Sequence, residues 1–330
     1  MGIPVKRLLG KSREAVRWLR DIRSYDPAAR RSRRRGPSRV QIQTIDRCNA
    51  ACIMCPYSAL DKTAPVHRMN DELYRRILAE IHRSGTVRRV TLMLQNEPLL
   101  DREFAARVRL ARQLLGRNVR LSTVTNGSPL TAAVIGELEA CGIDHVSVSI
   151  DSIREDTFAR IRQGLDLHRV LGNTLSLIQR LGPRRVGVKF LRQRENEGQE
   201  EEFAAYWRSY GITVSFTEPC NRAGCLESYE SIKKLRPDAW KRFIHPILNR
   251  CIPACPLPFS ELDVLWDGRV ILCCNDWGPH DIVGDLSAQT LEEVWNGEQI
   301  NHYRHLLWTR RASESLVCAG CSQSDRYWKI

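Results

Sequence analysis

Short runs in which apolar and polar residues alternate recur along the middle of the chain, and this pattern predicts β-strands. The runs span residues 40–45, 90–94, 119–124, 145–150, 186–191 and 212–216. Apolar residues recur at helical spacing between the runs, and Asn70 is placed to cap the helix after the first of them. Strands that alternate with helices pair in parallel through right-handed crossovers. Because six strands are fewer than the eight that close a barrel, we expect an α/β fold, a partial (β/α)6 TIM-like barrel.

This alternation stops near residue 219. Apolar runs at 262–265 and 269–273 flank Trp266-Asp267-Gly268, which predicts a β-hairpin with a glycine-containing turn. Short helices are predicted at 291–295 and 300–307. Because cysteines are frequent here, we expect a small metal-stapled C-terminal domain made of this hairpin and short helices. The predicted organisation is a basic extension at 1–38, the partial barrel at 39–218 and the metal-stapled domain at 219–330.

Positive charge is concentrated at the N-terminus. The first 40 residues hold 13 Lys and Arg against 3 Asp and Glu, whereas the whole chain has a formal net charge of +13. A solvated, partly helical tether is the expected structure, and nucleic-acid binding by this arm is the less favoured alternative. One apolar face of the tether is expected to dock on the body through Val5, Leu8, Leu9, Val16, Leu19 and Ile22.

Hydropathy argues against a membrane-spanning protein and against a secreted one. No stretch approaches the roughly 18 apolar residues of a membrane span, and Lys6, Arg7 and Lys11 interrupt any signal-peptide core. We therefore expect a cytoplasmic protein without a membrane span, and no oligomeric state is indicated by the sequence. Disulfides are disfavoured in the cytoplasm, so the twelve cysteines are expected to bind metal or to do chemistry.

Three cysteines lie in one short segment directly after the first predicted strand. Cys48, Cys52 and Cys55 have the spacing CxxxCxxC. Three thiolates this close can hold an iron–sulfur cubane and leave one iron open to a further ligand. A three-cysteine zinc site completed by a distant residue such as His67 is the alternative.

The cysteine segment and the motifs that follow it in order resemble the radical S-adenosylmethionine (SAM) superfamily, over nearly the whole chain after residue 40. Gln95-Asn96-Glu97-Pro98 stands where the family has Gly-Gly-Glu-Pro, and it lacks both glycines. Thr125-Asn126-Gly127 and the segment from Ser147 to Asp151 resemble later elements of the family. The resemblance implies that the cofactor-binding residues are Glu97, Asn126, Ser149, Asp151 and Arg162.

The resemblance also implies the chemistry. In the family, the cysteine motif holds a [4Fe–4S] cluster whose open iron binds S-adenosyl-L-methionine. One electron, for which the family implies flavodoxin or ferredoxin as donor, cleaves SAM. The resulting 5′-deoxyadenosyl radical takes a hydrogen atom from a carbon of the substrate.

A second group of cysteines lies in the C-terminal region. Cys255, Cys273, Cys318 and Cys321 form a set of four, which can complete a metal cluster without an open position. A four-cysteine zinc site is the alternative. The pattern resembles the SPASM domain in its shortened form, called twitch, and implies one auxiliary [4Fe–4S] cluster.

Five cysteines remain outside these sets. Cys141 ends a predicted helix and is expected to be a small buried hydrophobic residue. Cys251 lies four residues before Cys255 and is a candidate catalytic residue that returns a hydrogen atom to a substrate radical. A bystander role or an alternative cluster ligand remains open for Cys251. No role is predicted for Cys220, Cys225 and Cys274.

The favoured function is a radical SAM enzyme that acts on a small polar natural product of sugar or aminocyclitol type. The reaction is expected to be oxidation of an alcohol or epimerisation, because family members with the shortened domain include such enzymes. A maturase that modifies a peptide or protein side chain is one alternative. A non-enzymatic electron carrier or RNA-binding protein is the other.

Overall fold

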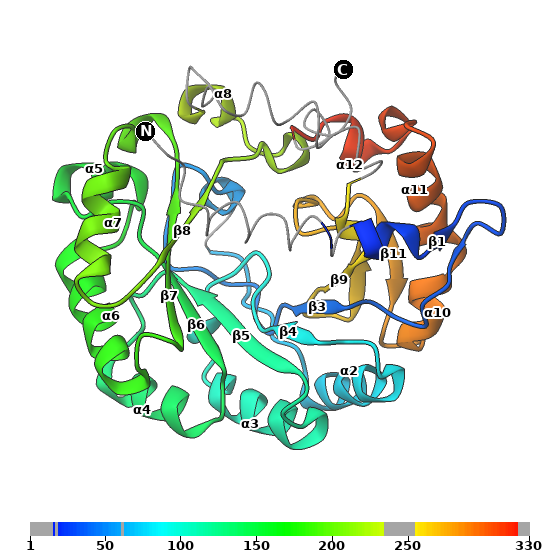
Figure 1. Cartoon of the computed structure of the whole chain (residues 1–330), viewed down its shortest axis with the longest axis horizontal. Coiled ribbons are helices and arrows are strands. Elements are labelled where there is room, and N and C mark those ends of the chain that lie inside the picture. The colour runs from blue at the N-terminus through cyan, green and yellow to red at the C-terminus, as the bar shows by residue number, and fades with distance from the viewer. Residues whose placement is uncertain (1–15, 17–18, 61–62, 234–254, 323–330) are drawn as a thin grey trace.

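The computed structural model describes residues 16, 19–60, 63–233 and 255–322. Six parallel strands form the predicted partial barrel, in chain order across the sheet (Figure 1). They are β3 (Arg39–Ile42), β4 (Arg89–Thr91), β5 (Arg120–Thr125), β6 (His145–Ser149), β7 (Val186–Leu191) and β8 (Val214–Thr217). Each lies within a few residues of a predicted strand, so the expected α/β fold is confirmed.

Helices cover the outer face of this curved sheet (Figure 1). They are α2 (Asp71–Ser84), α3 (Phe104–Leu115), α4 (Ala132–Ala140), α5 (Glu155–Ile161), α6 (Leu167–Leu181) and α7 (Glu200–Arg208). The side chain of Asn70 accepts a hydrogen bond from the Leu73 N–H, which confirms the predicted N-cap of α2. Alternate strand residues such as Val90, Val146 and Val188 are fully buried under the helices. Their neighbours in sequence face the inside of the barrel, which we call the lumen.

The C-terminal hairpin continues the same sheet. Its strands are β9 (Glu261–Val264), β10 (Arg269–Ile271) and β11 (Ile282–Asp285). β9 pairs in parallel with β3, and β10 and β11 extend the sheet antiparallel to a total of nine strands among the described residues. The predicted hairpin is therefore present, but it extends the barrel instead of forming a sheet of its own.

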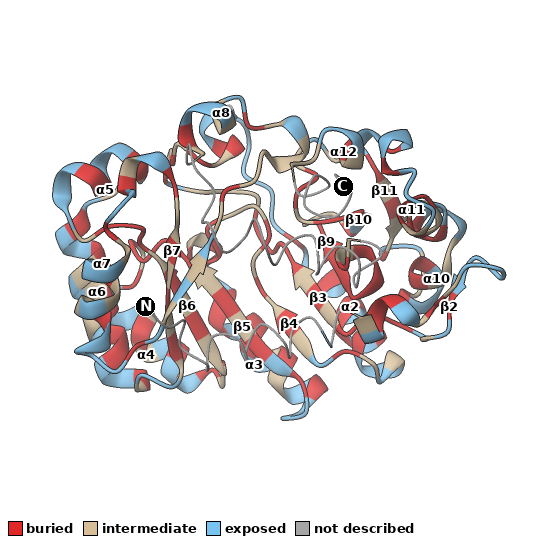
Figure 2. Ribbon diagram, turned by 45° about the horizontal axis from the view of Figure 1, so that its top comes forward, coloured by how far each residue is buried: buried red, intermediate tan, exposed pale blue. Residues whose placement is uncertain are grey.

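Short helices complete the C-terminal region. They are α8 (Tyr229–Ile232), α10 (Leu291–Asn296), α11 (Glu298–Trp308) and α12 (Leu316–Ala319). The 3-10 helices among the described residues are η1 (Pro56–Ala59), η2 (Pro98–Leu100), η3 (Arg194–Asn196), η4 (Arg222–Gly224), η5 (Leu257–Phe259) and η6 (Ala312–Glu314). The predicted helices near 291–295 and 300–307 are thus confirmed. Along helices such as α2 and α6, buried residues alternate with exposed ones, so each of these helices buries one face (Figure 2).

The described part of the basic extension packs on the C-terminal region. β1 (Tyr25–Asp26) and β2 (Arg31–Ser32) form a small hairpin. Ile22 is fully buried in a cluster that also contains Leu19 and Phe259, which confirms two of the predicted docking residues. Val16 is 66% exposed, so its predicted docking is wrong. Val5, Leu8 and Leu9 lie outside the described residues.

None of the helices in the described ranges is long and apolar enough to cross a lipid bilayer.

Candidate functional site

The three cysteines of the CxxxCxxC segment lie together in the loop after β3. Cys52 is buried, and Cys48 and Cys55 are partly buried in the same cluster. The N–H of Ala51 donates to the carbonyl of Gln163 at 2.8 Å, which holds this loop against the segment after α5. Burial raises the pKa of the Cys48 thiol to about 12. Because such a thiol ionises when a metal replaces its proton, the set fits a thiolate-bound iron cluster.

Arg162 connects this cysteine loop to the end of β6. Its Nη1 lies 3.7 Å from the Sγ of Cys52, and its Nη2 forms an ion pair with Oδ2 of Asp151 at 2.6 Å. Asp151 has a left-handed backbone with a φ of 69°. The Leu191 N–H donates to its Oδ1 at 2.7 Å, and Asn196 Nδ2 donates to its carbonyl at 2.8 Å. Asp151 is fully buried and positions Arg162, and its predicted contact with SAM stays a prediction.

Glu97 is equally enclosed. Its carboxylate accepts hydrogen bonds from Thr125 Oγ1 and from the Asn126 N–H, both at 2.7 Å, and from the Leu99 N–H at 3.2 Å. Its side chain therefore joins the loop after β4 to the end of β5. Burial raises the pKa of Glu97 to about 7, against these hydrogen bonds, which lower it.

Asn126 reaches from the end of β5 to the cysteine loop. Its Nδ2 donates to Oδ1 of Asn49 at 2.9 Å, and Asn49 Nδ2 donates to Ser128 Oγ at 2.8 Å. Asn49 and Ser128 also border a cavity of about 280 Å³, together with Gly164 and Arg169. Neither Asn49 nor Ser128 was predicted from the sequence as a site residue. The only available signal was that Asn49 lies next to Cys48.

Gln95 adopts the left-handed backbone for which glycine is best suited. Its φ is 56°, and the Gly-Gly-Glu-Pro motif that this segment resembles has glycine at the same position. Its Nε2 donates to the carbonyls of Asp276 at 2.9 Å and Cys274 at 3.3 Å. The side chain that replaces glycine thus ties this motif to the loop after β10.

The four C-terminal cysteines of the second set line one small enclosed space. Cys255, Cys273, Cys318 and Cys321 surround a cavity of about 30 Å³ whose remaining wall is mostly apolar. Ser315 accepts the N–H of Cys318 at 3.1 Å and so fixes the start of α12. Burial raises the pKa of Cys318 to about 11 and that of Cys255 further. Four thiols around one closed space fit a fully ligated cluster.

Arg222 is partly buried near cysteines of both sets and was not predicted from the sequence as a site residue. Burial opposes its charge, but the neighbouring thiols, Cys220 first and then Cys274, Cys55 and Cys273, raise the pKa of Arg222. Its Nη1 donates to Oδ1 of Asn275 at 3.1 Å. Arg222 therefore lies near one cysteine of each predicted metal-binding set, Cys55 and Cys273.

The remaining cysteines are dispersed. Cys141 is buried in the main core, as predicted. Cys220 contacts Asn275 through its Sγ at 3.2 Å, and Cys225 is partly buried. Cys251 lies outside the described residues, so its predicted catalytic role stays a prediction.

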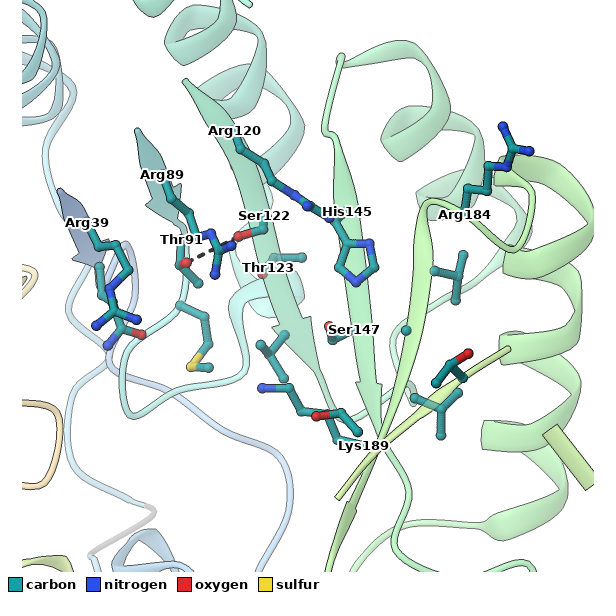
Figure 3. Close-up of a pocket in the computed structure, with 18 of the residues that line it drawn as sticks. Arg39, Arg89, Thr91, Arg120, Ser122, Thr123, His145, Ser147, Arg184 and Lys189 are labelled. Atoms are coloured by element: carbon teal, nitrogen blue, oxygen red, sulfur yellow. Dashed lines mark hydrogen bonds between the residues drawn. The ribbon is translucent and has the colours of Figure 1, made fainter. Parts of the chain in front are cut away.

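The lumen of the barrel holds a cavity of about 850 Å³ (Figure 3). Its wall is rich in polar side chains, which include Gln41, Thr91, Ser122, Ser147, Lys189, Ser215 and Glu261. Ser149 follows Ser147 on the lumen face of β6 and lies in register with Lys189 of β7. Burial lowers the pKa of Lys189, and the positive charge of Arg222 lowers it further.

Two carboxyl groups flank Gln41 on the β9 side of the lumen. Nε2 of Gln41 donates to Oε1 of Glu261 and to Oδ1 of Asp263, both at 2.9 Å. One oxygen of each carboxyl group and the Sγ of Cys274 lie within 4.8 Å of one another. Burial first, and then the charge of Glu261, raise the pKa of Asp263 well above its usual value.

Comparison with known proteins identifies the family. The sequence model of the Radical SAM superfamily matches residues 42–205, and that of the SPASM iron-sulfur cluster-binding domain matches residues 255–322. An S-adenosyl-L-methionine-dependent 2-deoxy-scyllo-inosamine dehydrogenase from Niallia circulans is 19% identical over 86% of this chain and 92% of its own length. A GTP 3′,8-cyclase from Rhodopseudomonas palustris is 34% identical, but over 40% of this chain and 38% of the relative.

Solved structures share the fold. BtrN in complex with AdoMet and 2-DOIA has a TM-score of 0.60 at 19% identity, over 86% of this chain and 92% of BtrN. SuiB of Streptococcus suis, bound to its precursor peptide SuiA, has a TM-score of 0.67 at 12% identity, over 92% of this chain and 72% of SuiB. The chain therefore belongs to the radical SAM superfamily, as an enzyme with a SPASM-type domain whose cofactors are S-adenosyl-L-methionine and two iron–sulfur clusters.

Proposed function

We propose that the enzyme oxidises one alcohol carbon of a small polyhydroxylated substrate to a ketone. The observation that carries the proposal is the polar lumen of about 850 Å³, a volume in the range of small-molecule sites. Hydroxyl, amide and carboxyl side chains on its wall can bind the hydroxyl groups of a sugar or cyclitol. The dehydrogenase relative from Niallia circulans, matched over 86% of this chain, supports the same reaction class.

In this proposal the two cysteine sets hold the clusters, and the lumen binds the substrate. Cys48, Cys52 and Cys55 would hold the first cluster, and Cys255, Cys273, Cys318 and Cys321 the auxiliary cluster. When bound, SAM with the first cluster supplies an acceptor for a hydrogen atom, and the auxiliary cluster supplies an acceptor for one electron. Arg162, held by Asp151, and Asn126, held by Glu97, border the first of these centres.

A side chain of the protein must accept the hydroxyl proton. Conversion of an alcohol to a ketone removes one hydrogen atom from carbon, one proton from oxygen and one electron, and it forms the C=O bond. Asp263 lies in register with Gln41, a residue of the cavity wall, and its Oδ1 accepts a hydrogen bond from Gln41 Nε2 at 2.9 Å, which places a carboxyl group beside the lumen. We assign Asp263 as the base that takes the hydroxyl proton.

Deuterium transfer tests the proposal. The anaerobically reconstituted enzyme is incubated with SAM and a panel of sugars and cyclitols, free and phosphorylated, each deuterated at its alcohol carbons. We expect one class of substrate to yield a ketone and to place deuterium in 5′-deoxyadenosine. Unlabelled 5′-deoxyadenosine and no ketone across the panel would overturn the proposal.

Epimerisation gives a different product in the same assay. An epimerase returns a hydrogen atom to the substrate, so the alcohol would be recovered with inverted configuration and with solvent deuterium when the reaction runs in D₂O. That result would favour Cys251 as a hydrogen-atom donor over Asp263 as a base. A ketone without solvent deuterium at the reacting carbon supports oxidation.

The proposed reaction also requires an electron donor and a compartment that preserves iron–sulfur clusters. SAM cleavage requires a low-potential one-electron donor, and we propose flavodoxin or ferredoxin for that role. We also propose a cytoplasmic location, where two oxygen-sensitive clusters and free thiols are maintained.

A further inference from the structure

Two buried carboxylates lie in the same loop as one cysteine of the second set. Asp276 and Asp281 both belong to the loop between β10 and β11, which also carries Cys273. Asp276 is fully buried, and Asp281 is 4% exposed. The N–H of Asp276 donates to the carbonyl of Cys273 at 2.9 Å. Both carboxylates therefore share one short loop with a residue that would hold the auxiliary cluster.

Hydrogen bonds to the backbone fix the shape of this loop. The carboxylate of Asp276 accepts the N–H of His280 at 3.0 Å and the N–H of Asp281 at 2.9 Å. The N–H of Leu272 donates to the carbonyl of Asp281 at 3.0 Å, so the loop closes next to Cys273. The carboxylate of Asp276 thus binds within the loop, whereas the carboxylate of Asp281 binds other parts of the chain.

Asp281 connects the loop to α12, which carries Cys318. Its Oδ2 accepts the hydroxyl of Ser315 at 2.9 Å and the N–H of Val317 at 3.4 Å. The Oγ of Ser315 in turn accepts the N–H of Cys318 at 3.1 Å. The hydroxyl of Tyr303, on α11, donates to Asp281 as well. One buried carboxylate therefore joins two segments that carry cysteines of the second set.

The negative charge of this carboxylate acts on the sulfur of Cys318. Burial is the largest cause of the raised pKa of Cys318, and the charges of Cys321, Asp281 and Asp276 raise it further. A negative charge that opposes a thiolate also opposes the extra electron of a reduced cluster, so it lowers the reduction potential. The positive charge of Arg222 offsets part of this effect.

We propose that Asp281 holds Cys318 in place through Ser315 and lowers the reduction potential of the auxiliary cluster. It is a positioning residue, because it acts on the cluster through Ser315 and through its charge. Hydrogen bonds and net charge around the sulfurs are among the factors that set the potential of an iron–sulfur cluster. This role requires the auxiliary cluster, and it does not require the proposed alcohol oxidation.

A low potential suits an electron acceptor that works in the presence of a strong reductant. The donor that reduces the first cluster is also able to reduce the auxiliary cluster. A reduced auxiliary cluster cannot accept the electron that the proposed oxidation of an alcohol releases. By lowering the potential, Asp281 favours the oxidised state that this reaction needs.

Redox titration of the reconstituted holoenzyme, followed by electron paramagnetic resonance, measures the potential. SAM binds the first cluster, so the signal that does not change in a reference sample with SAM belongs to the auxiliary cluster. Asp281→Asn keeps the size of the side chain and an oxygen for Ser315, but it removes the charge. We expect reduction of the auxiliary cluster to become about tenfold more favourable, a rise of about 59 mV for one electron, and the first cluster to be unchanged.

The matched control is Glu314→Gln, which removes the same charge from the residue next to Ser315. The Glu314 side chain is 47% exposed and is paired with Arg311. Because solvent and salt screen an exposed charge, neither potential should change in this variant. Tyr303→Phe removes a hydrogen-bond donor from Asp281, so the carboxylate charge is less compensated and the auxiliary potential should fall.

An auxiliary potential that is unchanged or lower in Asp281→Asn, or an equal rise in Glu314→Gln, overturns the role of Asp281. Iron analysis shows whether each variant keeps both clusters, about eight irons per chain. If Asp281→Asn loses the auxiliary cluster, Tyr303→Phe decides, because a lower potential supports the role and an unchanged one overturns it. A raised potential in Asp281→Asn without ketone formation from any polyol supports the role of Asp281 and overturns only the dehydrogenase.

Discussion

The Nη2 of Arg162 and Oδ2 of Asp151 lie 2.6 Å apart in a buried ion pair next to the first cysteine set. The Asp151 side chain is 1% exposed and that of Arg162 is 12% exposed. Each residue stabilises the charge of the other, because a buried charge without a partner is strongly unfavourable. The pair sets the position of the guanidinium group that contacts Cys52.

Asp151→Asn should destabilise the protein by about 3 kcal/mol, because it leaves the Arg162 charge buried without a counter-charge. Anaerobic urea denaturation of the reconstituted enzyme measures this change. The matched control is Asp156→Asn, which removes an exposed ion pair with Arg160 on α5 and should cost less than about 0.5 kcal/mol. Equal effects of the two substitutions would show that Asp151 is not a structural anchor for Arg162.

Gln95→Gly should leave the protein more stable than Gln95→Ala by about 1 kcal/mol, since glycine adopts the φ of 56° without strain. Both variants lose the hydrogen bonds to Asp276 and Cys274, so their difference isolates the backbone. The same denaturation experiment measures it. If the alanine variant is as stable as the glycine variant, the left-handed backbone at this position carries no strain.

Glu97 should make stability depend on pH. Its folded-state pKa is raised to about 7, so between the unfolded pKa of about 4.5 and 7 the folded state binds more protons than the unfolded state. The stability contributed by this proton is present below pH 4.5 and is lost as pH rises through 7. Glu97→Gln should therefore show a flatter fall in melting temperature between pH 5 and 8 than the wild type. A fall as steep as that of the wild type would contradict the raised pKa.

Local sequence patterns located the strands of the barrel and the two cysteine sets. The features that were not predicted depend on contacts between residues far apart in the sequence. The period-two runs located β3 to β8, and Asn70 located the start of α2, because each depends on a few adjacent residues. The parallel pairing of β9 with β3 joins segments more than 200 residues apart, and no local pattern encodes it. The same holds for the link between Asn49 and Asn126.

The first residues of three strands show the same limit on prediction. Arg39, Arg89 and Arg120 each begin a strand, yet only the register places them side by side. Asp151 was recognised from its motif, but its role as an anchor for Arg162 depends on the left-handed backbone and on Leu191 and Asn196, which the fold brings to it.

Asp263→Asn should separate SAM cleavage from product formation. The variant keeps the shape and the Gln41 contact of the side chain but cannot accept a proton, so ketone formation should fall by about 10²-fold or more. Formation of 5′-deoxyadenosine and transfer of deuterium from the substrate should persist, because they precede or do not need the base. Quantifying both products in single-turnover reactions measures the separation.

The neighbouring carboxylate provides the control for this prediction. Glu261→Gln removes a charge from the same hydrogen-bonded group but leaves Asp263 able to ionise, and it lowers the pKa of Asp263 by removing a like charge. Ketone formation should therefore survive and extend to lower pH. If Glu261→Gln abolishes the ketone and Asp263→Asn does not, Glu261 is the base. If both variants form ketone at the wild-type rate, the proton leaves by a route that uses neither carboxylate.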